Sequence, residues 1–89
     1  ACGDSMINAR IYDGDIVFIR KQSMVDNGEI AAVVIDDEAT LKRVNYYPEK
    51  NLLILKAENP DYEDLVYTGE QLDHIIILGK AVAFQSDVR

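Results

Sequence analysis

Residues 29–47 read EIAAVVIDDEATLKRVNYY, and this stretch decides the fold. It begins with an unbroken apolar run at 30–35, which is typical of a strand covered on both faces. Asp36-Asp37 ends the run, and residues 39–46 then alternate with a period of two, as a second strand does. The stretch therefore predicts a β-hairpin.

The second arm of this hairpin carries a lysine on a face with few other charges. Successive side chains of a strand point to opposite faces, so Thr40, Lys42 and Val44 share one face. A strand lysine commonly extends its stem along apolar surface and keeps its ammonium in water. The alternative is a buried amine with a chemical role, and the hairpin alone leaves both interpretations open.

The rest of the chain continues as short strands separated by turn residues. Asp13-Gly14-Asp15 and Asp26-Asn27-Gly28 are strong turn sequences, and Pro60 interrupts a surface loop at 57–62. Residues 6–12 are either one helical turn or irregular. Further strands are expected at 16–19, 52–55, around 65–67, and at 74–78 and 81–84, the last two as one strand bent at Gly79.

Five or six short strands without a helical stripe predict a mostly-β fold, either a folded sheet or a partly open barrel. We find no repeat, low-complexity tract or linker, so residues 1–89 are expected to form one domain. The chain starts at Ala1 without an initiator Met, and we expect it to be a fragment of a longer protein.

Charge and cysteine content narrow the classes of function. Nine Lys and Arg against sixteen Asp and Glu give a net charge of −7, which repels phosphate backbones and anionic lipids. Direct DNA binding by this segment is therefore not expected. Cys2 is the only cysteine, which excludes an intrachain disulfide and favours a cytoplasmic location. The longest apolar run is much shorter than the about 20 residues of a membrane span.

Gly3-Asp4-Ser5-Met6 offers a candidate nucleophile. A serine hydroxyl needs a base, and a lysine serves as that base when burial disfavours its ammonium form. Ser5 and Lys42 are therefore a candidate Ser-Lys dyad, with the backbone N–H groups of Asp4 and Ser5 as candidate oxyanion donors. The competing interpretation of Ser5 is a turn serine that binds its local backbone. The pair Cys2 and His74 lacks any catalytic signature.

Blocks of sequence, in order, resemble the C-terminal domain of the LexA and phage-repressor family. The four leading blocks are GDSM at 3–6, IYDGDIV at 11–17, NGEIA at 27–31 and IDDEATLKR at 35–43. The resemblance continues through LILKAENPDY at 53–62 and ILGKAV at 77–82, so it spans nearly the whole chain. The two candidate catalytic residues are 42 − 5 = 37 positions apart, as the family leads us to expect.

This resemblance implies a fold shared with signal peptidases and a self-cleaving Ser-Lys serine endopeptidase. Ser5 would be the nucleophile, Lys42 the general base, and the amides of Asp4 and Ser5 the oxyanion donors, with no cofactor and no metal. The family cleaves its own linker to an N-terminal DNA-binding domain when a RecA filament stimulates it in the SOS response. Asp4 replaces a hydrophobic residue of LexA proper, which points to the phage-type or mutagenesis-type branch.

The family also dimerises through its C-terminal region, which places Ile75, Ile77, Val82 and Phe84 at an expected homodimer contact. The DNA-binding domain and the scissile pair are expected outside residues 1–89, because Cys2-Gly3 lies too close to Ser5 to reach its own active site.

Three alternatives remain open. The first two are a non-catalytic dimerisation module of a phage-type repressor and a mutagenesis-type self-cleaving accessory of translesion polymerases. A signal peptidase would need a membrane anchor and usually a Pro soon after the Met, where this chain has Ile7-Asn8.

Overall fold

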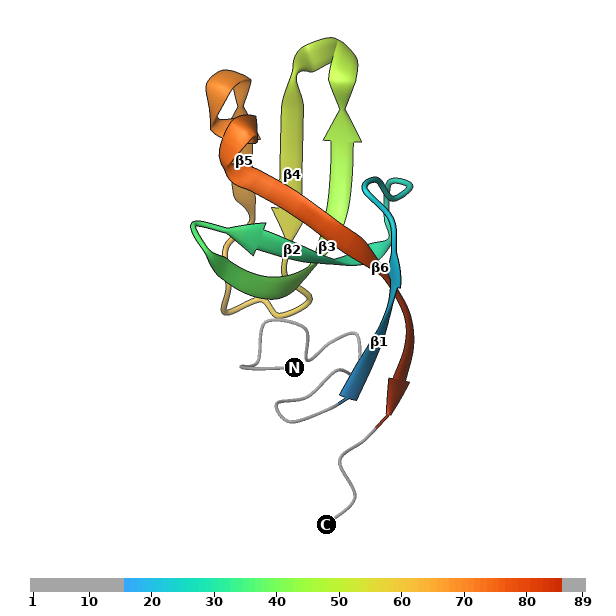
Figure 1. The fold of residues 1–89 in the computed structure, drawn as a ribbon. Helices are drawn as coiled ribbons and strands as arrows, with labels where there is room; N and C mark the ends of the chain where they lie inside the picture. Colours follow the sequence, from blue (N-terminus) through green and yellow to red (C-terminus); the bar gives the residue numbers. More distant parts are fainter. Residues whose placement is uncertain (1–15, 86–89) are drawn as a thin grey trace.

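The computed structural model describes residues 16–85, with side chains as far as Ala83, and these residues form one antiparallel sheet (Figure 1). The strand order is β1-β6-β2-β3-β4-β5. The elements are β1 (Ile16–Lys21), β2 (Ile30–Ile35), β3 (Glu38–Tyr47), η2 (Pro48–Lys50), β4 (Leu52–Lys56), β5 (Leu65–Thr68), η3 (Gly69–His74) and β6 (Ile75–Gln85). This architecture confirms the mostly-β prediction in its open form, since β1 and β5 are the edges of a six-stranded sheet.

The predicted hairpin is formed by β2 and β3. Ile35 pairs with Glu38, and Asp36 and Asp37 make the two-residue turn with φ angles of 48° and 68°. Aspartate tolerates this left-handed backbone better than most residues, and such turns match the twist of the flanking strands. No residue of β2 is exposed, as expected for the apolar run in the middle of the sheet.

Strand β6 is long and pairs with two neighbours. It lies across β2 and then continues beside β1 (Figure 1). Gly79 lies where β6 pairs with both strands, opposite Ala32 and Lys21. A Cβ atom at this position would lie 2.3 Å from the Arg20 carbonyl oxygen, so only glycine allows β1 to approach this closely. The prediction that one strand continues through Gly79 is confirmed.

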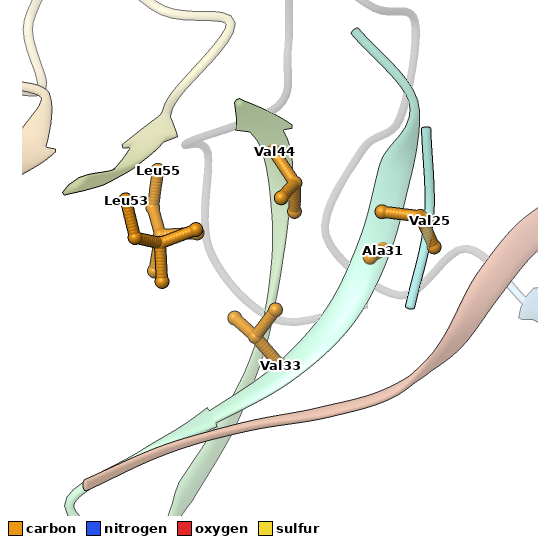
Figure 2. Close-up of a cluster of buried hydrophobic side chains, with 6 residues drawn as sticks. All are labelled: Val25, Ala31, Val33, Val44, Leu53 and Leu55. Atoms are coloured by element: carbon orange, nitrogen blue, oxygen red, sulfur yellow. The ribbon is translucent and has the colours of Figure 1, made fainter. Parts of the chain in front are cut away.

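The buried core lies on one face of the central strands. Its side chains come from β2, β3, β4 and the segment before β2, and Figure 2 shows them gathered together. They are Val25, Ala31, Val33, Val44, Leu53 and Leu55. Because Val44 pairs with Leu55 across β3 and β4, the alternation of each strand brings these positions to the same face.

The segment before β6 differs from the sequence prediction. His74 ends the 3-10 helix η3 and does not begin a strand. The Thr68 N–H donates a hydrogen bond of 3.0 Å to Gln71 Oε1, and this contact ties the first turn of η3 to the end of β5.

Residues 6–12, for which the sequence allows one helical turn or an irregular segment, lie outside the described residues. Within residues 16–85 no helix is long and apolar enough to cross a membrane.

Candidate active site

Lys42 lies in the middle of β3 and points to the core face of the sheet. Its Cα pairs with Ala31 of β2, whose small side chain is fully buried. Lys42 itself is only 8% exposed, and among the described side chains it is the one buried residue with a polar or charged group. The predicted face is confirmed, and the Lys42 residue is mostly buried on it.

Burial changes the acid–base chemistry of this amine. Desolvation lowers the pKa of Lys42 from its ordinary value of 10.5, because the ammonium form loses hydration that the neutral amine needs less. No carboxylate among residues 16–85 forms an ion pair with Lys42 that would counteract this effect. The result is the environment that a lysine general base requires.

Two charged neighbours of Lys42, one beside it on β3 and one on β6, form ion pairs with other side chains. Arg43, on the opposite face of β3, forms an ion pair with Glu58 and donates a hydrogen bond to the Gly28 carbonyl. Lys80 of β6 pairs with Glu29, and the hydrogen bond from Lys80 is the main cause of a lowered pKa at that carboxylate. Neither pair therefore supplies a counter-ion to the amine of Lys42.

The connection between β4 and β5 brings an aromatic ring to Lys42. Glu58, at its start, is held to β3 by Arg43, and the Asp61 N–H donates a hydrogen bond of 2.9 Å to Asn59 Oδ1. The Tyr62 N–H then bonds the Asn59 carbonyl at 3.0 Å. This turn places the Tyr62 ring so that Lys42 Nζ lies over it, 5.8 Å from the ring centroid. The sequence gives no signal for this contact, because it depends on where the loop docks.

The other half of the proposed dyad lies outside the described residues. Asp4 and Ser5 precede residue 16, so their distance from Lys42, and the oxyanion donors, stay predictions. Within residues 16–85 no group of three or more His, Cys, Asp or Glu side chains is arranged to hold a metal.

The expected dimer residues fall in different environments. Ile75 and Ile77 are partly buried and pack against the core cluster, whereas Val82 is 43% exposed, and the side chain of Phe84 lies outside the described ones. Ile76, at 57% exposed, and Leu78, at 43%, are two further accessible apolar residues of β6. Beside the core, a pocket of about 180 Å³ is lined by Ser23, Met24, Tyr46, Leu53, Leu72, Ile75 and Ile77.

Comparison with known proteins gives consistent matches. The model of a family described as Peptidase S24-like matches residues 1–82. The LexA repressor of Desulfitobacterium hafniense is 45% identical over 80 residues, which cover 90% of this chain and 36% of that protein. The LexA repressor of Frankia alni is 48% identical over 81 residues, which cover 91% of this chain and 29% of that protein. The LexA repressor of Desulforamulus reducens is 43% identical over 86 residues, which cover 97% of this chain and 37% of that protein. The chain thus spans about a third of the length of these curated relatives.

Proposed function

The chain belongs to the Peptidase S24-like family, and we propose that it is the self-cleaving C-terminal domain of a LexA-like or prophage transcriptional repressor. In this proposal Ser5 is the nucleophile and Lys42 its general base. The observation that carries it is the burial of Lys42, which lowers the pKa of an amine that has no ion-pair partner among the described residues. Such burial is unusual for a lysine and is the condition under which its neutral form can accept a proton.

The proposed reaction has two stages. The neutral amine of Lys42 takes the proton from Ser5 Oγ as this oxygen attacks the carbonyl carbon of the scissile bond. The backbone N–H groups of Asp4 and Ser5 stabilise the resulting oxyanion. Lys42 then returns the proton to the leaving nitrogen, the C–N bond breaks, and an ester to Ser5 remains. Water, deprotonated by Lys42, attacks this ester and releases Ser5. An amine and a hydroxyl perform these steps without a cofactor.

The proposed substrate is the linker that joins this domain to an N-terminal DNA-binding domain. Cleavage would separate the two domains and remove the repressor from DNA in the cytoplasm, with a RecA filament as the stimulating partner in the SOS response. The names of the relatives, all LexA repressors, support this role. The net charge of −7 agrees with DNA contact through another domain only.

The test uses the full-length protein with its native linker, incubated between pH 6 and pH 10. Cleavage should accelerate as pH rises through the lowered pKa of Lys42. Ser5→Ala removes the nucleophile and should stop cleavage. Lys42→Ala should slow cleavage by about a hundredfold or more, since a general base contributes that much. Lys56→Ala is the matched control, because Lys56 is exposed on the neighbouring strand β4 and should leave the rate unchanged. Persistent cleavage in both Ser5→Ala and Lys42→Ala would sink the proposal.

A non-catalytic dimerisation module is the second candidate function. The exposed apolar residues of β6, Ile76, Leu78 and Val82, favour it. Intact protein that stays uncleaved at alkaline pH with a RecA filament, yet sediments as a dimer, would decide for this role. A mutagenesis-type protein would instead cleave, and would carry a short tail before Ala1 in place of a DNA-binding domain.

A further inference from the structure

The Tyr62 ring is the feature of the site that the proposed dyad does not use. Tyr62 is 44% exposed, whereas the Lys42 side chain over its ring is 8% exposed. An ammonium within about 6 Å of an aromatic ring centroid is attracted by the negative face of that ring. The 5.8 Å between Lys42 Nζ and the Tyr62 centroid meets this condition.

We propose that Tyr62 is a positioning residue that holds the ammonium form of Lys42 by its ring face and thereby restrains the proposed dyad. The inference rests on the proposed function for its consequence, because it concerns the base of the same reaction. The ring attracts the charged form only, so it opposes the effect of burial. Part of the lysine population is then kept protonated, and unable to act as a base, at a pH where burial alone would have released the proton.

The backbone that carries the Tyr62 ring is anchored by neighbouring residues of the site. The connection between β4 and β5 is anchored next to Lys42 by the ion pair of Glu58 with Arg43, the immediate neighbour of Lys42 on β3. The Tyr62 N–H is fixed on the Asn59 carbonyl at 3.0 Å. The backbone of Tyr62 therefore belongs to an anchored turn, and this turn presents the ring to the amine.

The described charged groups around Lys42 leave the ring as its specific partner. On the side of β2 and β6, Glu29 is paired with Lys80, and on β3 Arg43 is paired with Glu58. Lys56 of β4 is exposed, opposite Arg43. The loop contributes Asp61, Glu63 and Asp64, all exposed. Burial is the cause of the lowered pKa of Lys42, with no charged neighbour contributing to it.

The experiment separates this inference from the proposed function. Full-length protein carrying Ser5→Ala is labelled on lysine Cε, and the titration of Lys42 is followed by NMR. Three proteins are compared in this background: one with Tyr62 unchanged, one with Tyr62→Phe and one with Tyr62→Leu. Tyr62→Leu keeps an apolar side chain but removes the ring, and should lower the titration midpoint by about half a pH unit. Tyr62→Phe keeps the ring and should leave the midpoint unchanged. Tyr47→Leu, at the far end of β3 and on its other face, is the matched control.

Cleavage provides the second measurement. With Ser5 restored, Tyr62→Leu should cleave about threefold faster than wild type below the midpoint, as a shift of half a pH unit requires. An unchanged or raised midpoint in Tyr62→Leu overturns the inference, and so does an equal shift in Tyr62→Phe. Absence of cleavage in wild type overturns the proposed function alone, because the titration in the Ser5→Ala background still reports whether the ring holds the amine.

Discussion

Lys42 occupies a position at which the alternation of β3 would otherwise bring an apolar side chain to the core. Val44, two residues later on the same face, is fully buried, and Ala31 across the strand pair is also fully buried. An ammonium at such a position destabilises the folded state because it loses hydration. A group retained in this environment is more readily explained by chemistry than by stability.

Lys42→Met should therefore stabilise residues 1–89 at pH 7, by about 0.5–2 kcal/mol. The pKa of Lys42 is lower in the folded chain than its ordinary value of 10.5, so between these two values the unfolded chain binds more protons. Wild-type stability should rise with pH across that window, and the advantage of Lys42→Met should shrink there. Urea unfolding at several pH values measures both effects.

The control for this variant is Lys56→Met, at an exposed position that should change stability by less than about 0.5 kcal/mol at every pH. A less stable Lys42→Met protein, with a difference from wild type that does not depend on pH, would show that the amine stabilises the fold.

The sequence predicted the face of the strand on which Lys42 lies, but not the side chains that contact it from other segments. Strand alternation places Lys42 beside Thr40 and Val44 whatever the rest of the fold does. The contact with Tyr62 depends on how the connection between β4 and β5 folds back, and no local pattern encodes that. Ser5 was assigned from motif order and stays a prediction, because residues before 16 lie outside the described part.

Among the elements, strands with strong turn residues at their ends were the most predictable. The Asp36-Asp37 turn and the apolar run before it defined β2 and β3 from sequence. The sequence did not predict the helix η3, because six residues of 3-10 helix are too short to show a hydrophobic periodicity. Its sequence signal was Thr68 followed three residues later by Gln71, a capping box that sequence analysis can recognise.

Gly79 is the element-scale position with the sharpest prediction. In Gly79→Ala the new Cβ would meet the Arg20 carbonyl oxygen at 2.3 Å and Ile19 Cγ2 at 2.6 Å. Since the nearest atom belongs to the backbone, β1 must move away from β6, at a cost of about 1–3 kcal/mol. Denaturant unfolding gives the total, and hydrogen exchange of the β1 amides should increase more than that of β3.

Gly69→Ala is the comparison, because Gly69 has a φ of 57° and nothing within 4 Å of an added Cβ. Gly69→Ala should lower the free energy of unfolding by only about 1 kcal/mol, the cost of a left-handed backbone at a residue with a Cβ. The β1 amides should stay protected from hydrogen exchange. Equal effects of the two substitutions on β1 exchange would contradict the close approach at Gly79.

At the scale of the whole molecule, β6 is the strand on which we propose the homodimer contact. Two register shifts, one against β2 and one against β1, leave Leu78 and Val82 without a paired residue, and both are 43% exposed. Such bulges re-aim side chains out of the ladder. Ile75 and Ile77 were also expected at the dimer contact, but they pack against the core, so Leu78 and Val82 are better placed for a partner.

The proposed homodimer must bring together two chains that each carry a net charge of −7. Their repulsion is screened by salt, whereas burial of apolar residues is not weakened by it. Raising NaCl from about 0.05 M to about 0.5 M, which shortens the Debye length roughly threefold, should therefore tighten the dimer in sedimentation equilibrium.

Val82→Asp should weaken the dimer about tenfold or more, because the new carboxylate loses water and adds repulsion. Val66→Asp introduces the same charge at a valine that is 56% exposed on the edge strand β5, which three strands separate from β6, and it should leave association nearly unchanged. Dissociation by Val66→Asp alone would move the interface to β5, and a dimer weakened by salt would mean that ion pairs hold it.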